Sequence, residues 1–303
     1  MATTVTGGVS RRTDARSLRR KAERTRALER SVIHVILLVG SITMLFPLYW
    51  MISTSLKPQH EVFLLPPTWF PSDFQWIHYR QAFVDYFSFA QYGTNTMIIT
   101  LGVLVGRLLS ASLVAFGFAR IRFIGRDVIF ILVLSTMMVP GQVTIIPLYI
   151  LFKDLGWLNT FYPLIVPAWF GGGAFFIFLL RQFILTINPE LDDAARIDGC
   201  GWLGIYGRIT MPLIKPALAA VAIFSFLGTW NDFFGPLIFL RSRDMLTLAV
   251  GLHFMATAAS SSVRPNLPHL MAGSTMILIP PLLVFFFAQR YFIQGVTFSG
   301  IKG

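Results

Sequence analysis

The side chains that could do chemistry in this chain are few and widely scattered. Five histidines and the single cysteine lack the spacing of metal ligands, and the adjacent Asp192 and Asp193 would point about 100° apart on a helix. None of the five lysines follows a glycine, as a phosphate-binding loop requires. No nucleophile has a neighbouring base. These patterns predict a protein that is not an enzyme and holds no metal or cofactor, so that any ATP hydrolysis must take place on another chain.

The composition points to the membrane. A chain of 303 residues would form about two soluble domains, but 55% of these residues are hydrophobic, only 13% are charged, and the mean hydropathy is +0.67. Nine of the 25 lysines and arginines lie in residues 1–30, so the net charge of +11 is partly a local feature of a basic tail. We therefore expect no nucleic-acid partner, and the lone Cys200 excludes an intrachain disulfide framework.

The elements that position the remaining polar groups are long apolar stretches. A bilayer core about 30 Å thick needs about 20 helical residues, and six stretches of sufficient length are nearly free of charge. The predicted spans are residues 32–55, 92–119, 128–151, 162–184, 216–240 and 270–292. The apolar core of the first is too long for a cleaved signal peptide, which makes it an uncleaved anchor.

A seventh stretch, residues 245–263, is too short and too polar to span and is predicted to be an interfacial or re-entrant helix. With six spans and the N-terminus in the cytoplasm, 18 lysines and arginines fall on the cytoplasmic side and six on the outer side. Because cytoplasmic loops carry the excess of positive charge, we expect both termini in the cytoplasm.

The loop between the fourth and fifth spans, residues 186–215, is patterned. Asn188 is a plausible N-cap, Pro189 suits the first helical turn, and acidic residues follow where the helix dipole favours them. Leu191, Ala194 and Ala195 form a small apolar strip, and Gly199 ends the helix. A second short helix should run from Gly201 towards Met211-Pro212. On periodicity alone, the loop could equally be an ordinary linker lying against the membrane surface.

The sequence from Glu190 to Pro216, ELDDAARIDGCGWLGIYGRITMPLIKP, resembles the cytoplasmic motif of ABC importer permeases. That motif is Glu-Ala-Ala, three residues, Gly, about nine residues, then an apolar-Pro pair. In this chain the places of the motif are taken by Asp193-Ala194-Ala195, Gly199 and Met211-Pro212. Three residues depart from the motif: Asp193 replaces glutamate, Met211 replaces leucine, and Cys200 stands where alanine is common. Weaker likenesses to the maltose and glycerol-phosphate (MalG-like) class are ARIRFIGR at 119–126, MMVPGQ at 137–142, FLLRQF at 178–183, WNDF at 230–233 and SGIKG at 299–303.

The resemblance implies an all-α, polytopic membrane protein with the six transmembrane helices of a type I ABC importer transmembrane domain. Its partners would be a second permease subunit, a pair of ATPase subunits that carry ATP and magnesium, and an extracytoplasmic solute-binding protein delivering a sugar. The loop helix would couple to the ATPase. The residues implied are Leu191, Asp193, Ala194, Ala195, Arg196, Asp198, Gly199 and Pro212. The C-terminal residues Gly300, Lys302 and Gly303 would also reach the ATPase, unless that end is simply frayed.

Polar or helix-breaking residues inside the spans are candidates for the transport pathway, because desolvated polar groups are costly there. We single out Trp230, Asn231, Asp232, Gln142 and Gly172. Asp232 could instead bond a neighbouring helix, and the glycines could simply allow close helix packing.

The expected organisation is a basic tail at 1–30, a permease domain at 31–293 with an outer loop at 241–269, and a cytoplasmic tail at 294–303. The outer loop is expected to contact the binding protein. Two alternatives stay open at this point: a secondary transporter driven by an ion gradient, and the same importer class with a cargo that is not a sugar.

Overall fold

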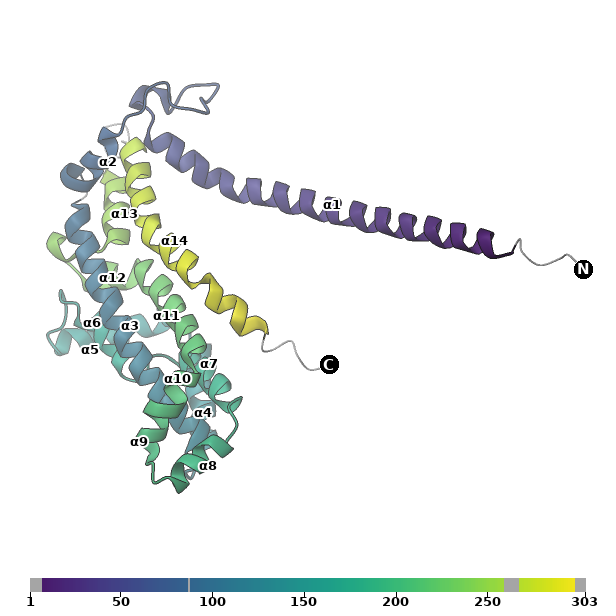
Figure 1. The fold of residues 1–303 in the computed structure, drawn as a ribbon. Helices are drawn as coiled ribbons and strands as arrows, with labels where there is room; N and C mark the ends of the chain where they lie inside the picture. The colour runs from purple at the N-terminus through teal and green to yellow at the C-terminus, as the bar shows by residue number, and fades with distance from the viewer. Residues whose placement is uncertain (1–6, 87, 259–266, 298–303) are drawn as a thin grey trace, which may run out of the picture.

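The computed structural model describes residues 7–86, 88–258 and 267–297, and every regular element in these ranges is helical (Figure 1). The first half of the chain contains α1 (Gly7–Ser55), η1 (Gln59–Glu61), α2 (Ile77–Gln81), η2 (Ala82–Tyr86), α3 (Phe89–Arg120), α4 (Arg126–Ser135), η3 (Thr136–Met138) and α5 (Gly141–Asp154). The second half contains α6 (Tyr162–Ile165), η4 (Val166–Trp169), α7 (Ala174–Leu185), α8 (Glu190–Ile197), α9 (Trp202–Gly204), η5 (Ile205–Thr210), α10 (Met211–Leu213), α11 (Lys215–Trp230), α12 (Phe234–Phe239), η6 (Arg243–Met245), α13 (Leu248–Ala258) and α14 (Leu267–Thr297).

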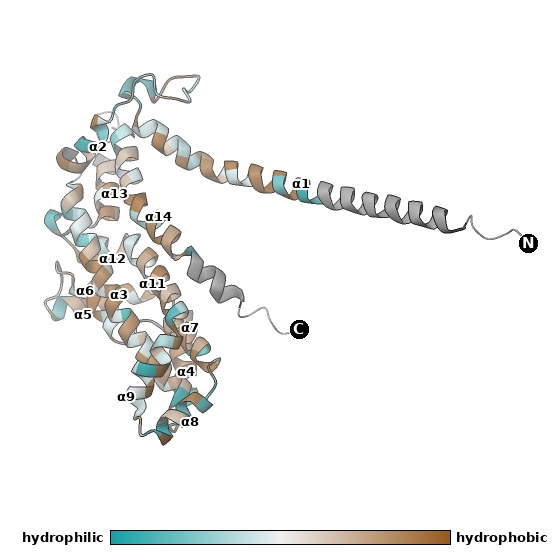
Figure 2. Ribbon diagram, viewed as in Figure 1, coloured by the Kyte–Doolittle hydropathy of each residue, from teal (hydrophilic) through white to brown (hydrophobic). Residues whose placement is uncertain are grey.

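Four helical segments are long and apolar enough to cross a bilayer: Glu29–Ser55, Phe89–Arg120, Tyr162–Leu185 and Leu267–Gln289. Two bent helix pairs raise the number to six within the described residues if each pair counts as one span. Hydrophobic residues make up most of the described length of these helices, and hydrophilic residues gather near their ends (Figure 2). The predicted all-α membrane fold is therefore confirmed.

The predicted span at 128–151 is present as a bent pair of helices, with an angle of 99° between Arg126–Met138 and Gly141–Asp154. Pro140 offers no backbone N–H to continue the helix and forces the preceding residue out of helical geometry. Val139 accordingly has an extended backbone with φ −80° and ψ 116°.

The predicted helix at 216–240 also breaks, since α11 ends at Trp230 and α12 begins only at Phe234. Two polar side chains bond the local backbone at the break, as short polar residues tend to do at helix ends. The Asn231 side-chain amide donates to the carbonyl oxygen of Leu227 at 2.8 Å, and the Asp232 carboxylate accepts the N–H of Gly235 at 3.2 Å.

The best-packed part of the molecule lies where α3, α7 and the segment from α9 to α11 meet. Its fully buried side chains include Ala111, Ala115, Leu180, Ile184 and Ile205. The N-terminal part of α1, by contrast, projects away from the body, and only its C-terminal end approaches α14 (Figure 1). The predicted short helix near 245–263 corresponds to α13, while residues 259–266 lie outside the described residues.

Candidate functional site

The predicted loop helix is present as α8, which begins at Glu190 with Pro189, not Asn188, in the N-cap position. The Asn188 side-chain oxygen accepts the N–H of Glu190 at 3.1 Å, and the first turn carries three acidic residues. At the other end Gly199 has φ +81°, a left-handed conformation that glycine adopts without a steric penalty. The N–H of Cys200 then donates to the carbonyl oxygen of Ala195 at 2.8 Å, which closes the helix.

The structure divides the predicted apolar strip between two faces of α8. Ala195 is buried against the core and so does not contribute to the exposed surface of α8. Leu191 and Ala194 are exposed, and they are joined by Ile197, whose side chain is 88% exposed. Asp193, Arg196 and Asp198 are also exposed beside this face. We call Leu191, Ala194 and Ile197 the open face of α8.

Asp192 lies on the buried side of α8, whereas the adjacent Asp193 is exposed. Its carboxylate oxygen Oδ2 is 2.9 Å from Nε of Arg120, the last residue of α3, and both side chains are less than one-tenth exposed. Arg120 also donates from Nη2 to the carbonyl oxygen of Ile187 at 2.8 Å. These contacts join α3 to the loop across 72 positions of sequence, a separation at which no local pattern could have identified the pair.

The second half of the loop packs on the same side of the molecule. The hydroxyl groups of Tyr206 and Ser112 lie 2.7 Å apart, and the Tyr206 ring contacts Phe116 with centroids 5.4 Å apart. The guanidinium of Arg196 lies 4.1 Å over the ring of Trp202, which ties α8 to α9. Pro212 is exposed in α10, directly before the chain bends by 78° into α11.

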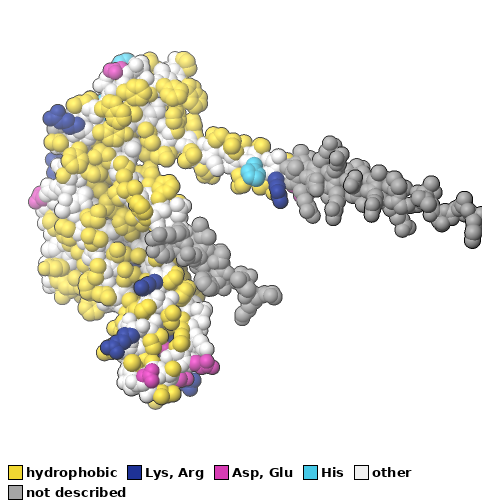
Figure 3. Space-filling model, in the orientation of Figure 1, with side chains coloured by type: hydrophobic (Ala, Val, Ile, Leu, Met, Phe, Trp, Pro, Cys, Tyr) yellow, Lys and Arg dark blue, Asp and Glu magenta, His cyan; other side chains and the backbone are white. Residues whose placement is uncertain are grey.

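A charged cleft of 760 Å³ opens beside α8. Its walls come from the end of α3, the start of α4 and α8 itself, and they include Arg122, Arg126, Asp193 and Arg196. In Figure 3, cationic and anionic side chains gather at this end of the molecule, whereas the body is covered mainly by hydrophobic side chains. This end of the molecule therefore presents a polar surface around a small apolar face.

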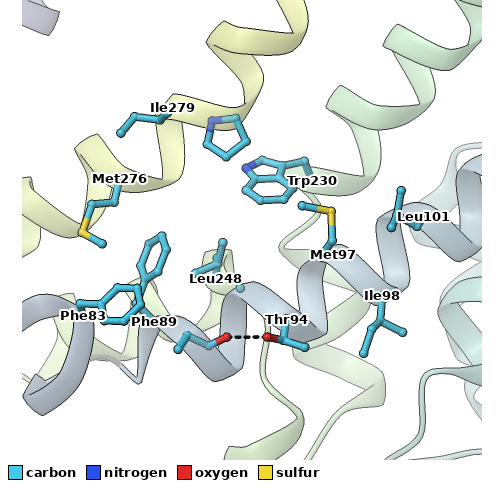
Figure 4. A pocket seen from close by; sticks show the side chains of 13 residues that line it. Phe83, Phe89, Thr94, Met97, Ile98, Leu101, Trp230, Leu248, Met276 and Ile279 are labelled. Atoms are coloured by element: carbon cyan, nitrogen blue, oxygen red, sulfur yellow. Dashed lines mark hydrogen bonds between the residues drawn. The ribbon is translucent and has the colours of Figure 1, made fainter.

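Of the five pathway candidates, Trp230 lies on an apolar cavity of 560 Å³ between α3, α11 and α14 (Figure 4). Its indole N–H donates to the carbonyl oxygen of Ile277 at 3.1 Å, and its ring stacks on Phe226. The walls include Phe83, Phe89, Met97 and Met276, and the hydroxyl of Thr94 already donates to Ala90. This wall chemistry suits an apolar side chain better than a hydroxyl-rich solute.

The other four candidates do not line that cavity. Asn231 and Asp232 bond the backbone at the break after α11, as described above. Gln142 is exposed in the first turn of α5, next to the 99° bend. Gly172 has φ +68°, and a Cβ there would lie 2.9 Å from Cβ of Ala111, so this glycine permits close packing of the break against α3. The candidates thus mark separate breaks in the spans.

Broken helices within a polytopic helical fold are typical of the membrane domains of transport proteins. The chain belongs to the family of binding-protein-dependent transport system inner membrane components, whose model matches residues 98–298. It is therefore a permease of a transport system and not an enzyme.

Characterised relatives cover most of the chain. It is 38% identical to the arabinooligosaccharides transport system permease protein AraQ of Halalkalibacterium halodurans, over 85% of this chain and 91% of that protein. It is 30% identical to the diacetylchitobiose uptake system permease protein DasC of Streptomyces coelicolor, over 90% of this chain and 96% of that protein. These relatives are permease subunits of sugar uptake systems.

The fold also matches a solved transporter. A chain of a bacterial ABC transporter involved in the import of the acidic polysaccharide alginate superposes with a TM-score of 0.78 at 25% identity, covering 89% of this chain and 98% of that chain. The ABC importer fold expected from the sequence is thus present, and these matches favour it over an ion-gradient-driven transporter. The C-terminal residues Gly300, Lys302 and Gly303 lie outside the described residues.

Proposed function

We propose that this chain is one permease subunit of an ATP-driven importer that receives a sugar or sugar derivative from a solute-binding protein. The cargo class rests on the relatives, whose names specify arabinooligosaccharides, diacetylchitobiose and sn-glycerol-3-phosphate. The 38% identity to the arabinooligosaccharide permease carries most weight, because it extends over 85% of the chain.

The open face of α8 is the proposed contact with a separate ATPase subunit. A short amphipathic helix docks in a groove through apolar anchors with polar flanks. Leu191, Ala194 and Ile197 supply the anchors, and Asp193, Arg196 and Asp198 supply the flanks. Ala195 acts from behind by packing α8 on the core, while Gly199 and Pro212 set the turns that hold the loop.

The energy of ATP hydrolysis reaches the membrane helices through this loop. The buried Arg120–Asp192 pair and the Tyr206–Ser112 contact fasten the loop to α3, so movement of α8 is transmitted to that helix. ATP and magnesium are bound by the ATPase dimer, and this chain holds no nucleotide of its own.

The remaining assignments follow from the same assembly. The tail 1–30, the coupling loop 186–215 and the tail 294–303 face the cytoplasm, and Gly300 to Gly303 extend towards the ATPase. The outer loop 241–269, which contains α13, faces the binding protein. A second permease subunit completes the pathway within the inner membrane, and Gln142, Gly172, Trp230, Asn231 and Asp232 are positions at which this chain's spans bend around it.

Reconstitution tests this proposal directly. The chain would be co-expressed with the second permease and the ATPase encoded beside it, purified as a complex and placed in proteoliposomes containing ATP. Uptake of an oligosaccharide is expected only with ATP and the cognate binding protein, and should not respond to collapse of a proton or sodium gradient. Uptake by the isolated chain that follows such a gradient would contradict the proposal.

The cargo is tested separately by exchanging the binding protein. Solute screens of the purified binding protein should return sugars, and its removal should abolish uptake. If the complex hydrolyses ATP but its binding protein recognises amino acids or peptides, the importer assignment stands and the sugar assignment is wrong.

A further inference from the structure

The segment between α1 and α2 has an outer surface that is mainly apolar. We call residues 62–76 the aromatic loop, and its exposed apolar side chains are Phe63, Leu64, Leu65, Trp69, Phe70, Phe74 and Trp76. Leu65 is 92% exposed and Phe70 is 72% exposed. A contiguous patch of this kind marks a surface that meets another apolar phase rather than water.

Two charged side chains beside the aromatic loop are turned inward, whereas Asp73 within the loop is exposed. Lys57 is 2% exposed, donates to the carbonyl oxygen of Thr68 and lies 4.3 Å over the ring of Trp50. Glu61 is 5% exposed and accepts hydrogen bonds from the hydroxyl and the backbone N–H of Ser72. Lys57 and Glu61 thus stabilise the inside of the loop, which is the reverse of the usual arrangement of charges in water. Ser72 and Asp73 are the exposed polar residues of a surface that is otherwise mainly apolar.

The aromatic loop is fastened to the last turns of α1. The hydroxyls of Tyr49 and Ser53 both donate to the carbonyl oxygen of Trp69, at 2.7 and 2.8 Å. The Trp69 ring packs edge-on against Trp50, and the Phe70 ring against Tyr49. The loop therefore lies beside the C-terminal end of α1 and is attached to it by these contacts (Figure 1).

The length of α1 sets the depth of this contact in the bilayer. Arg30 is the last charged residue before the apolar stretch, and about 20 helical residues cross a hydrocarbon core about 30 Å thick. Counted from Ser31, the far boundary falls near Trp50. Tyrosine and tryptophan are concentrated at this boundary in membrane proteins. The aromatic loop, which contacts residues 46–53, thus lies level with the lipid headgroups.

We propose that the aromatic loop is a membrane-interface anchor that lies among the headgroups and glycerol groups at the C-terminal end of α1 and fixes how deeply α1 sits. The lipid surface fits better than a protein partner because the loop's apolar surface continues that of α1, where Met44 is 81% and Leu45 58% exposed. The loop also offers the amphipathic rings of Trp69 and Trp76, and the N–H of Gln75 donates to the carbonyl oxygen of Leu56 directly after α1.

Spin labelling of the full-length chain in palmitoyl-oleoyl phosphatidylcholine nanodiscs tests the anchor. Cys200 is the only cysteine, so Leu65→Cys in a Cys200→Ser background carries a single nitroxide at a side chain that is almost fully exposed and packs on little. Leu38→Cys on α1 is the reference for a label inside the membrane. Arg243→Cys in η6 is the reference for a label in water, because Arg243 is an exposed charged residue. Collision rates with oxygen and with a water-soluble nickel chelate give the depth of each label.

The Leu65 label should show an oxygen-to-nickel ratio several-fold above the Arg243 label and below the Leu38 label. Phe63→Cys on the same surface should agree. A ratio equal to that of Arg243 would overturn the proposal by placing the loop in water. Protection from both reagents, or protection that appears only when the binding protein is added, would also overturn it by showing that the patch contacts protein.

Discussion

Arg120 and Asp192 form an ion pair with 2.9 Å between Nε and Oδ2, and both side chains are less than one-tenth exposed. The pair connects the end of the longest described span in the body, α3, to the helix proposed to receive force from the ATPase. Its burial makes it sensitive, because removal of one partner leaves the other charge desolvated.

We expect Asp192→Asn to loosen α8 from α3 at a cost of about 3–5 kcal/mol, as is typical when one partner of a buried ion pair is removed. Hydrogen exchange of residues 190–199 in nanodiscs should accelerate. Asp193→Asn is the matched control, since Asp193 is exposed in the same turn, and it should leave exchange unchanged. Equal acceleration in both variants would show that the pair does not hold the helix.

Gly199 is expected to stabilise the loop through its backbone conformation alone. A Cβ at Gly199 meets nothing within 4 Å, so the cost of Gly199→Ala is that of its left-handed backbone, about 1–2 kcal/mol. Gly201→Ala is the control, because Gly201 also has open space but has φ −74°. The temperature of thermal unfolding should be lowered by Gly199→Ala and not by Gly201→Ala. Gly199→Asn should recover part of the loss, since asparagine tolerates this conformation.

The open face of α8 can be tested with one substitution outside the protein core. Ile197→Asp should leave folding intact, because the side chain is 88% exposed, and should greatly reduce ATPase co-purification or binding-protein-stimulated hydrolysis. Ile124→Asp, at a fully exposed isoleucine between α3 and α4, is the control. If the complex and its activity survive Ile197→Asp, the ATPase does not dock on this face.

The break between η4 and α7 offers a separate test of close packing. Gly171 and Gly172 both have positive φ, but only at Gly172 would a Cβ come within 3.0 Å of neighbouring atoms of α3. Gly172→Ala should therefore destabilise the chain by about 1–3 kcal/mol more than Gly171→Ala, which is the usual penalty for overpacking. A lower melting temperature for Gly172→Ala than for Gly171→Ala in detergent would show this difference. Equal melting temperatures for the two variants would argue against the contact.

The folded conformation of the aromatic loop should become less stable in acid. The hydrogen bond from the Ser72 hydroxyl holds the pKa of Glu61 below its usual value, against the opposing effect of burial. Because the pKa is lower in the folded chain, the stabilisation is complete above the unfolded-state pKa of 4.5 and is lost as pH falls through the folded-state value. A nitroxide at Leu65 should gain mobility in that range, whereas Glu61→Gln should flatten the pH dependence. Unchanged mobility in the native loop would contradict this role of the carboxylate.

Much of the fold could be predicted from the sequence, because its elements are specified locally. Long charge-free stretches identify membrane helices wherever they occur, and Asn188 and Gly199 bound α8 through bonds and angles within a few residues. The sequence shows the helix-breaking residues near Pro140 and Trp230, but it does not show the angle at which each helix bends there. A helix interrupted by proline can kink, stop or turn sharply, depending on what packs around it.

The sequence by itself determined that this chain is a helical membrane protein with one structured loop whose motif resembles that of importer permeases. Only the tertiary structure decided which side of α8 is open, that Asp192 is paired with Arg120 instead of facing solvent, and that Lys57 and Glu61 are turned inward beneath an aromatic surface. The physical reason is that burial and ion pairing depend on atoms far apart in the chain. The periodicity of a single segment does not contain that information.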